Sequence, residues 1–316
     1  METTNLINLE ELNLKANNYI EPRIEFDSSM NFVYNDISFI KNDFNTSGTF
    51  ANINGYNTSN GLNVILKIPI DDSIENINSE IKILSLFNAF QNLYYKKNLF
   101  VTKLYKIFME SNDLTKKYIM IQKKYDGDVF HKFFYLNLNY QENYLLFVSL
   151  IYQVSSILIV LQDVFQFVHN DLKPNNIFFK IKDPTQAHTH ENVDFILADF
   201  GGSYINFNNR LSCGTLRGSL CTFNPNKDMY MLMHLLYTFI HDTFKKRAKK
   251  IITDIVGRWN LDTKYAKNDS EEWNKYYDTN KFSDKFNPRF IYNRVLELYP
   301  IIKRENDIVD IYNTLK

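Results

Sequence analysis

The stretch FVHNDLKPNNIFFK, residues 167–180, constrains the fold of this chain more than any other. Within eight positions it carries His169, Asp171, Lys173 and Asn176, and apolar residues flank them on both sides. Carboxylate, ammonium and amide groups are costly to bury unless each has a partner. We therefore expect a loop that carries chemistry, held between buried segments.

The residues on either side of this stretch predict a part of the chain that is rich in helix. An apolar run at about 142–165 has helical spacing. It is slightly short for a membrane span and contains Gln153, so we expect a buried helix of a globular lobe. The sequence VDFILADFGG, residues 193–202, predicts a strand that meets a glycine turn. A further helix is predicted at 228–240, and most of the remaining chain also has a helical pattern.

The first 124 residues carry a different pattern, that of a small β-rich unit with one main helix. Its expected elements are strands with turns over 36–70, with a strong short strand at 64–68, a helix at 74–90, and strands at 99–108 and 117–123. Residues 1–35 are polar and are interpreted as an N-terminal extension. The predicted fold class is α+β, in which a β-rich N-terminal lobe (36–124) is joined to an α-rich C-terminal lobe (125–316).

Composition narrows the class of protein. The 316 residues are enough for one large domain or for two lobes around a shared cleft. Basic and acidic residues number 36 each, so the net charge of zero gives no global signal for nucleic acid or an anionic membrane. The N-terminus has no basic start followed by an apolar core, so no secretory signal is expected. The two cysteines, Cys213 and Cys221, have no paired ligand spacing, which favours a reducing compartment without a disulfide framework.

The polar residues near the centre of the chain have the types that phosphoryl transfer requires. This reaction needs a positioned nucleophile, bound metal ions and positive charge around the phosphates. Asp171 can accept the proton of an attacking hydroxyl, and Lys173 can lie beside the transferred group. Asn176 offers Mg²⁺ an amide oxygen, and Asp199, at the end of a predicted strand, offers it a carboxylate.

Two motifs resemble those of eukaryotic-type protein kinases. HNDLKPNN, residues 169–176, is similar to their catalytic loop, and DFG, residues 199–201, is similar to their metal-binding motif. Lys67 in VILK resembles the strand lysine that holds the α- and β-phosphates of ATP. Glu80 on the next predicted helix resembles the partner of that lysine, and Glu75 is a weaker candidate. The resemblance implies catalytic roles for Asp171, Lys173, Lys67 and Glu80, and metal binding by Asn176 and Asp199.

The resemblance covers about residues 40–240 and also implies a nucleotide site. TSGTFANI (46–53) is similar to the glycine-rich phosphate loop, although Gly48 is the single usual glycine present. YIMIQKKYDGDVF (118–130) resembles the fifth strand and the hinge, with Ile121 as the gatekeeper. The residues that the resemblance places on ATP are Gly48, Phe50, Ile53, Lys67, Ile121, Gln122, Lys124, Asp128 and Phe178.

Two aspartates in these regions have further interpretations. Asp128 either reaches the ribose hydroxyls or is simply the acid of a helix N-terminus. Asp228 resembles the aspartate that anchors the central helix of the α-rich lobe and is tied to the catalytic loop. Backbone groups of Gln122 to Lys124 are expected at the adenine edge.

Several positions depart from the kinase pattern. Asn170 replaces the arginine that often precedes the catalytic aspartate, so switching through a phosphate bound to that arginine is not expected. Ile65 and Phe178 are bulky where the adenine is usually covered, which predicts a tight pocket. No Ala-Pro-Glu motif precedes Asp228, so the shelf for a protein substrate stays undefined.

Two further polar segments carry weaker signals. The loop at 181–192 contains His188 and His190, which we interpret as part of a mobile loop rather than a metal site. The basic run KKRAKK, residues 245–250, is interpreted as a solvated helix face.

The resemblance implies a Ser/Thr protein kinase that uses ATP and Mg²⁺ to phosphorylate a protein hydroxyl. Two alternatives stay open: a pseudokinase that acts as a scaffold or allosteric binder, and a phosphotransferase for small molecules of the aminoglycoside or choline type. We expect protein substrates bearing Ser or Thr, no nucleic-acid partner, no membrane span, a monomer and a cytoplasmic location. The chain is rich in residues with AT-rich codons, which is typical of some large DNA viruses, so the cytoplasm is that of a host or the location is a virion.

Overall fold

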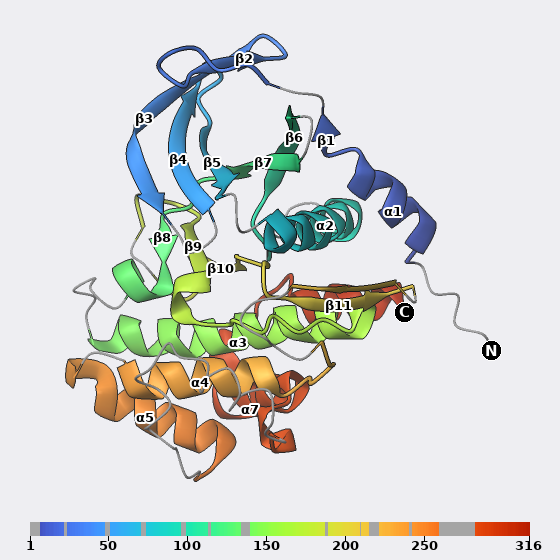
Figure 1. The fold of residues 1–316 in the computed structure, drawn as a ribbon. Coiled ribbons are helices and arrows are strands. Elements are labelled where there is room, and N and C mark those ends of the chain that lie inside the picture. Colours follow the sequence, from blue (N-terminus) through green and yellow to red (C-terminus); the bar gives the residue numbers. More distant parts are fainter. Residues whose placement is uncertain are drawn as a thin grey trace. The chain divides into compact units, whose positions relative to one another are not determined.

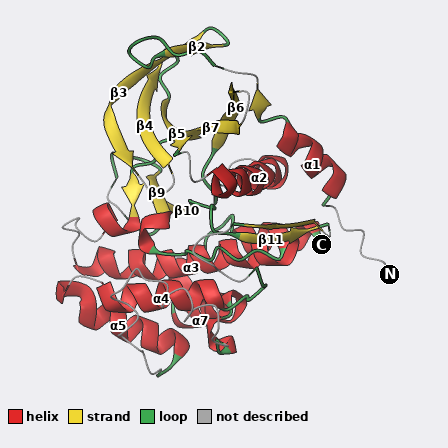
Figure 2. Ribbon diagram, viewed as in Figure 1, coloured by secondary structure: helices red, strands yellow, loops and turns green. Residues whose placement is uncertain are grey.

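The structure of this chain is a computed structural model that places it in two compact units. It describes residues 7–21, 24–47, 51–70, 74–95, 99–112, 115–133, 140–186, 189–208, 210–214, 221–239, 242–258 and 282–316. One unit, here the β unit, is Asn8–Lys124, and the other, the α unit, contains Tyr125–Lys316 and Ile7. Strands predominate in the β unit and helices in the α unit, as Figure 2 shows.

The β unit is built on a curled seven-stranded sheet (Figure 1). Its strand order is β1-β6-β7-β5-β4-β3-β2; β1 pairs with β6 in parallel, and the other neighbours are antiparallel. The strands are β1 (Ile20–Glu21), β2 (Phe32–Tyr34), β3 (Ile37–Ser47), β4 (Ala51–Thr58), β5 (Asn63–Pro69), β6 (Leu104–Asn112) and β7 (Thr115–Lys123). One face is apolar because alternate strand residues point the same way. Its buried core is Ile24, Phe32, Phe39, Tyr56, Val64, Leu66, Phe108, Ile119 and Ile121.

Two helices complete the β unit. Helix α1 (Leu9–Asn17) begins at Asn8, whose side chain accepts hydrogen bonds from two backbone N–H groups of its first turn, and it packs beside α2 (Ile74–Phe90) (Figure 1). A single π-helical turn, η2 (Gln91–Tyr95), follows α2. Residues 1–35 were interpreted as an N-terminal extension, but their described part contributes α1, β1 and β2 to this unit.

The α unit surrounds the long helix α3 (Tyr140–Phe165), which packs against α7, α8 and β10. Its other helices are α4 (Lys227–Phe239), α5 (Asp242–Val256), α7 (Pro288–Leu298) and α8 (Ile308–Leu315), with short turns η3 (Val129–Phe133), η4 (Pro174–Asn176), η7 (Asp284–Phe286) and η8 (Pro300–Ile302). Strands β8 (Gly127–Asp128), β9 (Ile177–Ile181) and β10 (Val193–Leu197) form one small sheet, and β11 (Tyr204–Phe207) pairs with β12 (Arg210–Cys213).

Helix α3 is long and apolar enough to cross a membrane, judged by its composition alone. However, 89% of its most apolar window is buried inside the fold, as expected for a core helix. The described part of the chain therefore contains no clear membrane span.

The α+β class and the main elements agree with the sequence-based expectations, whereas the expectation for the cysteines was wrong. Cys213, the last residue of β12, and Cys221 form a disulfide, with their Cα atoms 5.8 Å apart. The spacing of the two cysteines in the sequence could not reveal this pair, because the pairing depends on the fold placing Cys221 beside the end of β12. Gly55 lies inside β4, where the neighbouring strand β3 passes close to it. A Cβ there would lie 2.4 Å from Asn42 Oδ1 on the neighbouring strand.

Ionisation of Tyr56 should weaken the β unit at high pH. Burial and the nearby charge of Asp27 raise the pKa of Tyr56 to about 12, and its hydroxyl donates to Met30 O at 2.9 Å. The neutral phenol is thus favoured in the folded state, so stability is complete below about pH 10 and falls as the pH rises toward 12. We expect the urea midpoint of the wild type to fall in this window more than that of Tyr56→Phe. Parallel pH profiles for the two proteins would contradict the assignment.

Candidate functional site

The register of the β9–β10 pair brings the two expected metal ligands together. Ile177 lies opposite Leu197 in this antiparallel pair, so the next pair beyond it is Asn176 and Ala198. The Ala198 N–H donates to Asn176 O at 3.0 Å. Asp199 follows directly, which places its backbone beside Asn176 although the two residues are 23 positions apart in sequence.

Asp171 is tied to this end of the strand pair by the side chain of Asn176. Asn176 Nδ2 donates to Asp171 O at 2.9 Å and to Asp171 Oδ2 at 3.0 Å. Lys173 Nζ lies 2.9 Å from the same Oδ2. Both charged side chains keep about a third of their surface exposed, so they are accessible to solvent. The structure therefore brings together the acid, the cation and the amide of the opening stretch.

The donor atoms in this cluster fit Mg²⁺. The amide nitrogen of Asn176 is used by Asp171, so its oxygen is the atom that remains for a cation, and the neighbouring residue Asp199 carries a carboxylate, a ligand type that Mg²⁺ favours. Asp199 has a left-handed backbone, with φ of 60°, which is uncommon for a residue with a side chain and tends to occur at functional sites. Among the described residues, no group of three or more His, Cys, Asp and Glu side chains forms an alternative metal site.

Asp228 anchors the loop that precedes Asp171. Its carboxylate accepts the backbone N–H groups of His169 (2.7 Å) and Asn170 (3.0 Å). Burial raises the pKa of this carboxyl, while the neighbouring His169 and Lys227 and the two amide hydrogen bonds act in the opposite direction. The expected tie between Asp228 and the catalytic-type loop is therefore confirmed.

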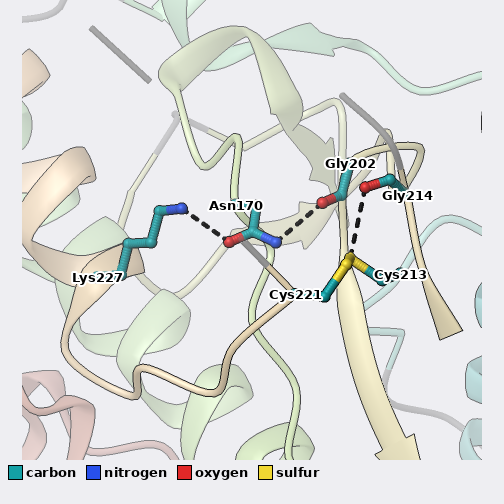
Figure 3. The surroundings of a disulfide bond; sticks show 6 residues. All are labelled: Asn170, Gly202, Cys213, Gly214, Cys221 and Lys227. Carbon is teal, nitrogen blue, oxygen red and sulfur yellow. Dashed lines mark hydrogen bonds between the residues drawn. A yellow bond between two sulfur atoms is a disulfide. The ribbon is translucent and has the colours of Figure 1, made fainter. Parts of the chain in front are cut away.

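The loop is also joined to the segment after DFG, through a residue whose role the sequence did not indicate. Asn170 Nδ2 donates to Gly202 O at 3.0 Å, and Asn170 Oδ1 accepts from Lys227 Nζ at 2.9 Å (Figure 3). Asn170 has φ of 66°, and Lys227 is almost fully buried. Asparagine tolerates this backbone better than most residues, which is the one signal that sequence alone offers for this position. A Lys beside Asp228 gives no comparable signal.

In the β unit, Lys67 and Glu80 form the expected ion pair. Lys67 Nζ lies 2.8 Å from Glu80 Oε1 and 2.6 Å from Oε2, and both side chains are buried. Lys67 lies on β5 and Glu80 on α2, whose apolar spacing turns one face toward the sheet. A buried charge needs such a partner, so the pair fixes the lysine head group in position.

The strand register changes one of the expected nucleotide contacts. On β5 and β7, Lys67 lies opposite Met120 and Leu66 lies opposite Ile121. Residues directly opposite one another in an antiparallel pair point to the same face. Ile121 therefore lies with Leu66 in the apolar core, on the face away from Lys67, and Met120 shares the face of Lys67. The motif match does not report strand faces, and the register separates Ile121 from Lys67, another residue of this strand pair that was expected on the nucleotide.

Strand register also shows which face of the sheet carries the other β-unit residues that were expected to contact the nucleotide. Ile53 lies opposite Lys67 and Gln122 opposite Ile65, so all four belong to the same face of the sheet. The Lys124 N–H donates to Asn63 O at 3.2 Å, so this amide is used within the sheet rather than left for an adenine. The Lys124 ammonium lies 4.2 Å from the centre of the Phe44 ring. Gly48 and Phe50 lie outside the described residues.

Asp128 and Phe178 are neighbours in the α unit, paired across β8 and β9. Asp128 Oδ1 accepts the His131 N–H at 2.7 Å, and its carboxylate also lies 3.0 Å from His131 Nδ1. Of the two interpretations, this geometry favours the acid of a helix N-terminus. Phe178 is partly buried, with its ring 5.9 Å from that of Tyr125.

The weaker polar signals have structural explanations. Burial lowers the pKa of His190, which lies in a loop near Arg304, and His188 lies outside the described residues. In the basic run on α5, Arg247 stacks on Tyr144 and Lys249 on Tyr237, both at 4.3 Å from the ring centres. These contacts favour a surface helix face over a binding patch.

Comparison with known proteins adds no family to this description. No protein-family model matches the chain, and a search of curated proteins finds no significant match.

Proposed function

We propose that this chain is a divergent Ser/Thr protein kinase with a bilobal, protein-kinase-like fold, using ATP and Mg²⁺. The observation that carries the proposal is the hydrogen-bonded set of Asp171, Lys173 and Asn176 at the end of the β9–β10 pair, directly beside Asp199. A turn with a purely structural role has no need for this combination of an acid, a cation and hard oxygen donors.

Each residue has a stated role in this proposal. Asp171 orients the substrate hydroxyl and accepts its proton, while Lys173 stabilises negative charge on the transferred group. Asn176 and Asp199 hold Mg²⁺, which neutralises phosphate charge when bound. Lys67, fixed by Glu80, contacts the nucleotide phosphates. Met120, rather than Ile121, is the residue of this strand that faces the nucleotide.

One observation favours the pseudokinase alternative. Backbone groups of Gln122 to Lys124 were expected at the adenine edge, but the Lys124 amide donates instead to Asn63 O. Without a hydrogen bond from this amide to the adenine, nucleotide binding is weaker, although all the ionic residues of the site are present. A chain that binds nucleotide poorly and does not turn over would act as a scaffold.

A single experiment separates the three functions. Purified full-length chain is incubated with Mg²⁺ and γ-labelled ATP, together with a generic basic protein, an acidic protein, or a panel of aminoglycosides and choline. Label on protein Ser or Thr supports the protein kinase. Label on the small molecules alone supports the small-molecule phosphotransferase, and a folded chain with neither product supports the scaffold.

The setting of the enzyme is part of the same proposal. We place it in the cytoplasm of a host cell or in a virion, acting as a monomer on protein substrates without a nucleic-acid partner. Sedimentation of the purified chain tests the monomer, because a dimer would sediment measurably faster.

A further inference from the structure

The disulfide Cys213–Cys221 closes a ring around the loop that precedes Asp171. Starting from Cys213, the β11–β12 hairpin leads back to Gly202 and Ser203. Gly202 O accepts from Asn170 Nδ2 at 3.0 Å, and Ser203 Oγ donates to His169 O at 3.1 Å.

The other side of the ring starts from Cys221. The chain runs from there to Lys227 and Asp228 at the start of α4. Lys227 Nζ donates to Asn170 Oδ1 at 2.9 Å, and Asp228 accepts the backbone N–H groups of His169 and Asn170. Both ends of the disulfide are therefore connected to the same two residues, His169 and Asn170.

The hairpin side of this ring is tightly fitted. Tyr204 and Val168 exchange two backbone hydrogen bonds, of 2.8 and 2.9 Å, and the Gly214 N–H donates to Ser203 O at 3.0 Å. A Cβ at Gly214 would lie 1.8 Å from Gly201 O, so the backbone after Cys213 passes in direct contact with the DFGG turn (Figure 3). A displacement of Cys213 would therefore be transmitted to the residues that follow Asp199.

The disulfide is accessible to thiols. Cys221 is exposed and Cys213 is partly exposed, whereas the hydrogen bonds that close the rest of the ring involve buried residues such as His169, Asn170 and Lys227. Exposed disulfides are the ones that exchange with thiols in solution, whereas buried ones resist exchange. The disulfide is thus the part of the ring that small thiols can open and close.

We propose that Cys213 and Cys221 are a reversible thiol–disulfide modification site that controls the proposed phosphotransfer, with the disulfide form active. The oxidant is a small-molecule disulfide. The Cys221 thiolate attacks it and displaces one small thiol, and the Cys213 thiolate then attacks the Cys221 sulfur and displaces the second. Two electrons pass to the small disulfide, and the two protein protons end on the two released thiols.

This control would not depend on a phosphate. Asn170 occupies the position of the arginine that would bind one, and its side chain is already used by Gly202 and Lys227. We therefore expect the covalent link to hold the β11–β12 hairpin and the start of α4 in place for a protein substrate. Reduction should leave Mg·ATP binding intact and lower kcat/KM for the protein substrate by about tenfold, a typical coupling between two sites.

The test is a redox titration of the full-length chain with reduced and oxidised glutathione, without oxygen. Acid quenching, alkylation and mass measurement give the fraction of disulfide at each ratio. Hydrogen exchange of the Tyr204 and Gly214 amides is followed in the same samples, as are phosphotransfer and the thermal shift with Mg·ATP. Cys213→Ser, Cys221→Ser and the double variant serve as controls that cannot form the bond.

We expect the wild type to show slower exchange at Tyr204 and Gly214 and higher kcat/KM as the disulfide forms. All three serine variants should stay at the reduced-state values at every ratio. The inference is overturned if the disulfide does not form at any ratio, or if exchange and kcat/KM stay constant while it forms.

The activity part of the inference rests on the proposed function, whereas the exchange part does not. If the chain shows no phosphotransfer in any redox state but its amide hydrogen exchange still slows on oxidation, the proposed kinase function is wrong and the proposed modification site stands. If the chain shows phosphotransfer whose rate does not change with the glutathione ratio, the proposed kinase function stands and the proposed redox control is wrong.

Discussion

Replacing Asp171 by Asn should lower kcat for protein phosphorylation by about a thousandfold, within the range expected when a general base is removed. The Asn side chain keeps an oxygen that can accept the hydrogen bond from Asn176 Nδ2, so the loop should hold its shape. It cannot accept the proton of the substrate hydroxyl. We therefore expect the thermal shift with Mg·ATP to be retained while turnover is lost.

Asp163→Asn is the matched control for this substitution. The Asp163 carboxylate is about as exposed as that of Asp171, 31% against 30%, and it also pairs with cations, Arg289 and Lys316. It lies outside the hydrogen-bonded set around Asn176, so its loss should leave kcat unchanged. Turnover of Asp171→Asn within tenfold of the wild type would exclude Asp171 as the base.

The elements of this chain could be predicted where a single segment carries a complete pattern. The helix at Ile74–Phe90 and the strand that contains Lys67 follow from local spacing and flanking residues, since periodicity reports which faces are buried. The ion pair between Lys67 and Glu80 was also expected, but from the resemblance to the kinase pattern; burial explains why the lysine needs such a partner.

Features that depend on strand register or on chain return could not be predicted in this way. The motif placed Ile121 on the nucleotide, but a change of one residue along β7 moves a side chain to the other face, and Met120 shares the face of Lys67. The disulfide and the Asn170–Lys227 hydrogen bond both depend on the tertiary structure. Neither contact has a local sequence pattern from which it could be predicted.

Removing the Lys67 ammonium should destabilise the β unit strongly. Glu80 is 1% exposed, so Lys67→Met leaves a buried carboxylate without this partner, which typically costs about 3–5 kcal/mol. Lys106→Met is the control in the same sheet. Its ion pair with Glu21 is more exposed, at 31% and 26%, so we expect a loss of no more than about 1 kcal/mol. Urea unfolding of the three proteins measures both losses.

The double variant Lys67→Met/Glu80→Leu separates the structural role of this pair from its proposed chemical role. Apolar residues of similar volume often replace a buried ion pair with little loss of stability. We therefore expect the double variant to regain most of the stability that Lys67→Met loses. If Lys67 contacts the nucleotide phosphates, the stable double variant should still lack both phosphotransfer and the thermal shift with Mg·ATP. Wild-type phosphotransfer by this variant would reduce Lys67 and Glu80 to a structural pair and remove the β unit from the proposed mechanism.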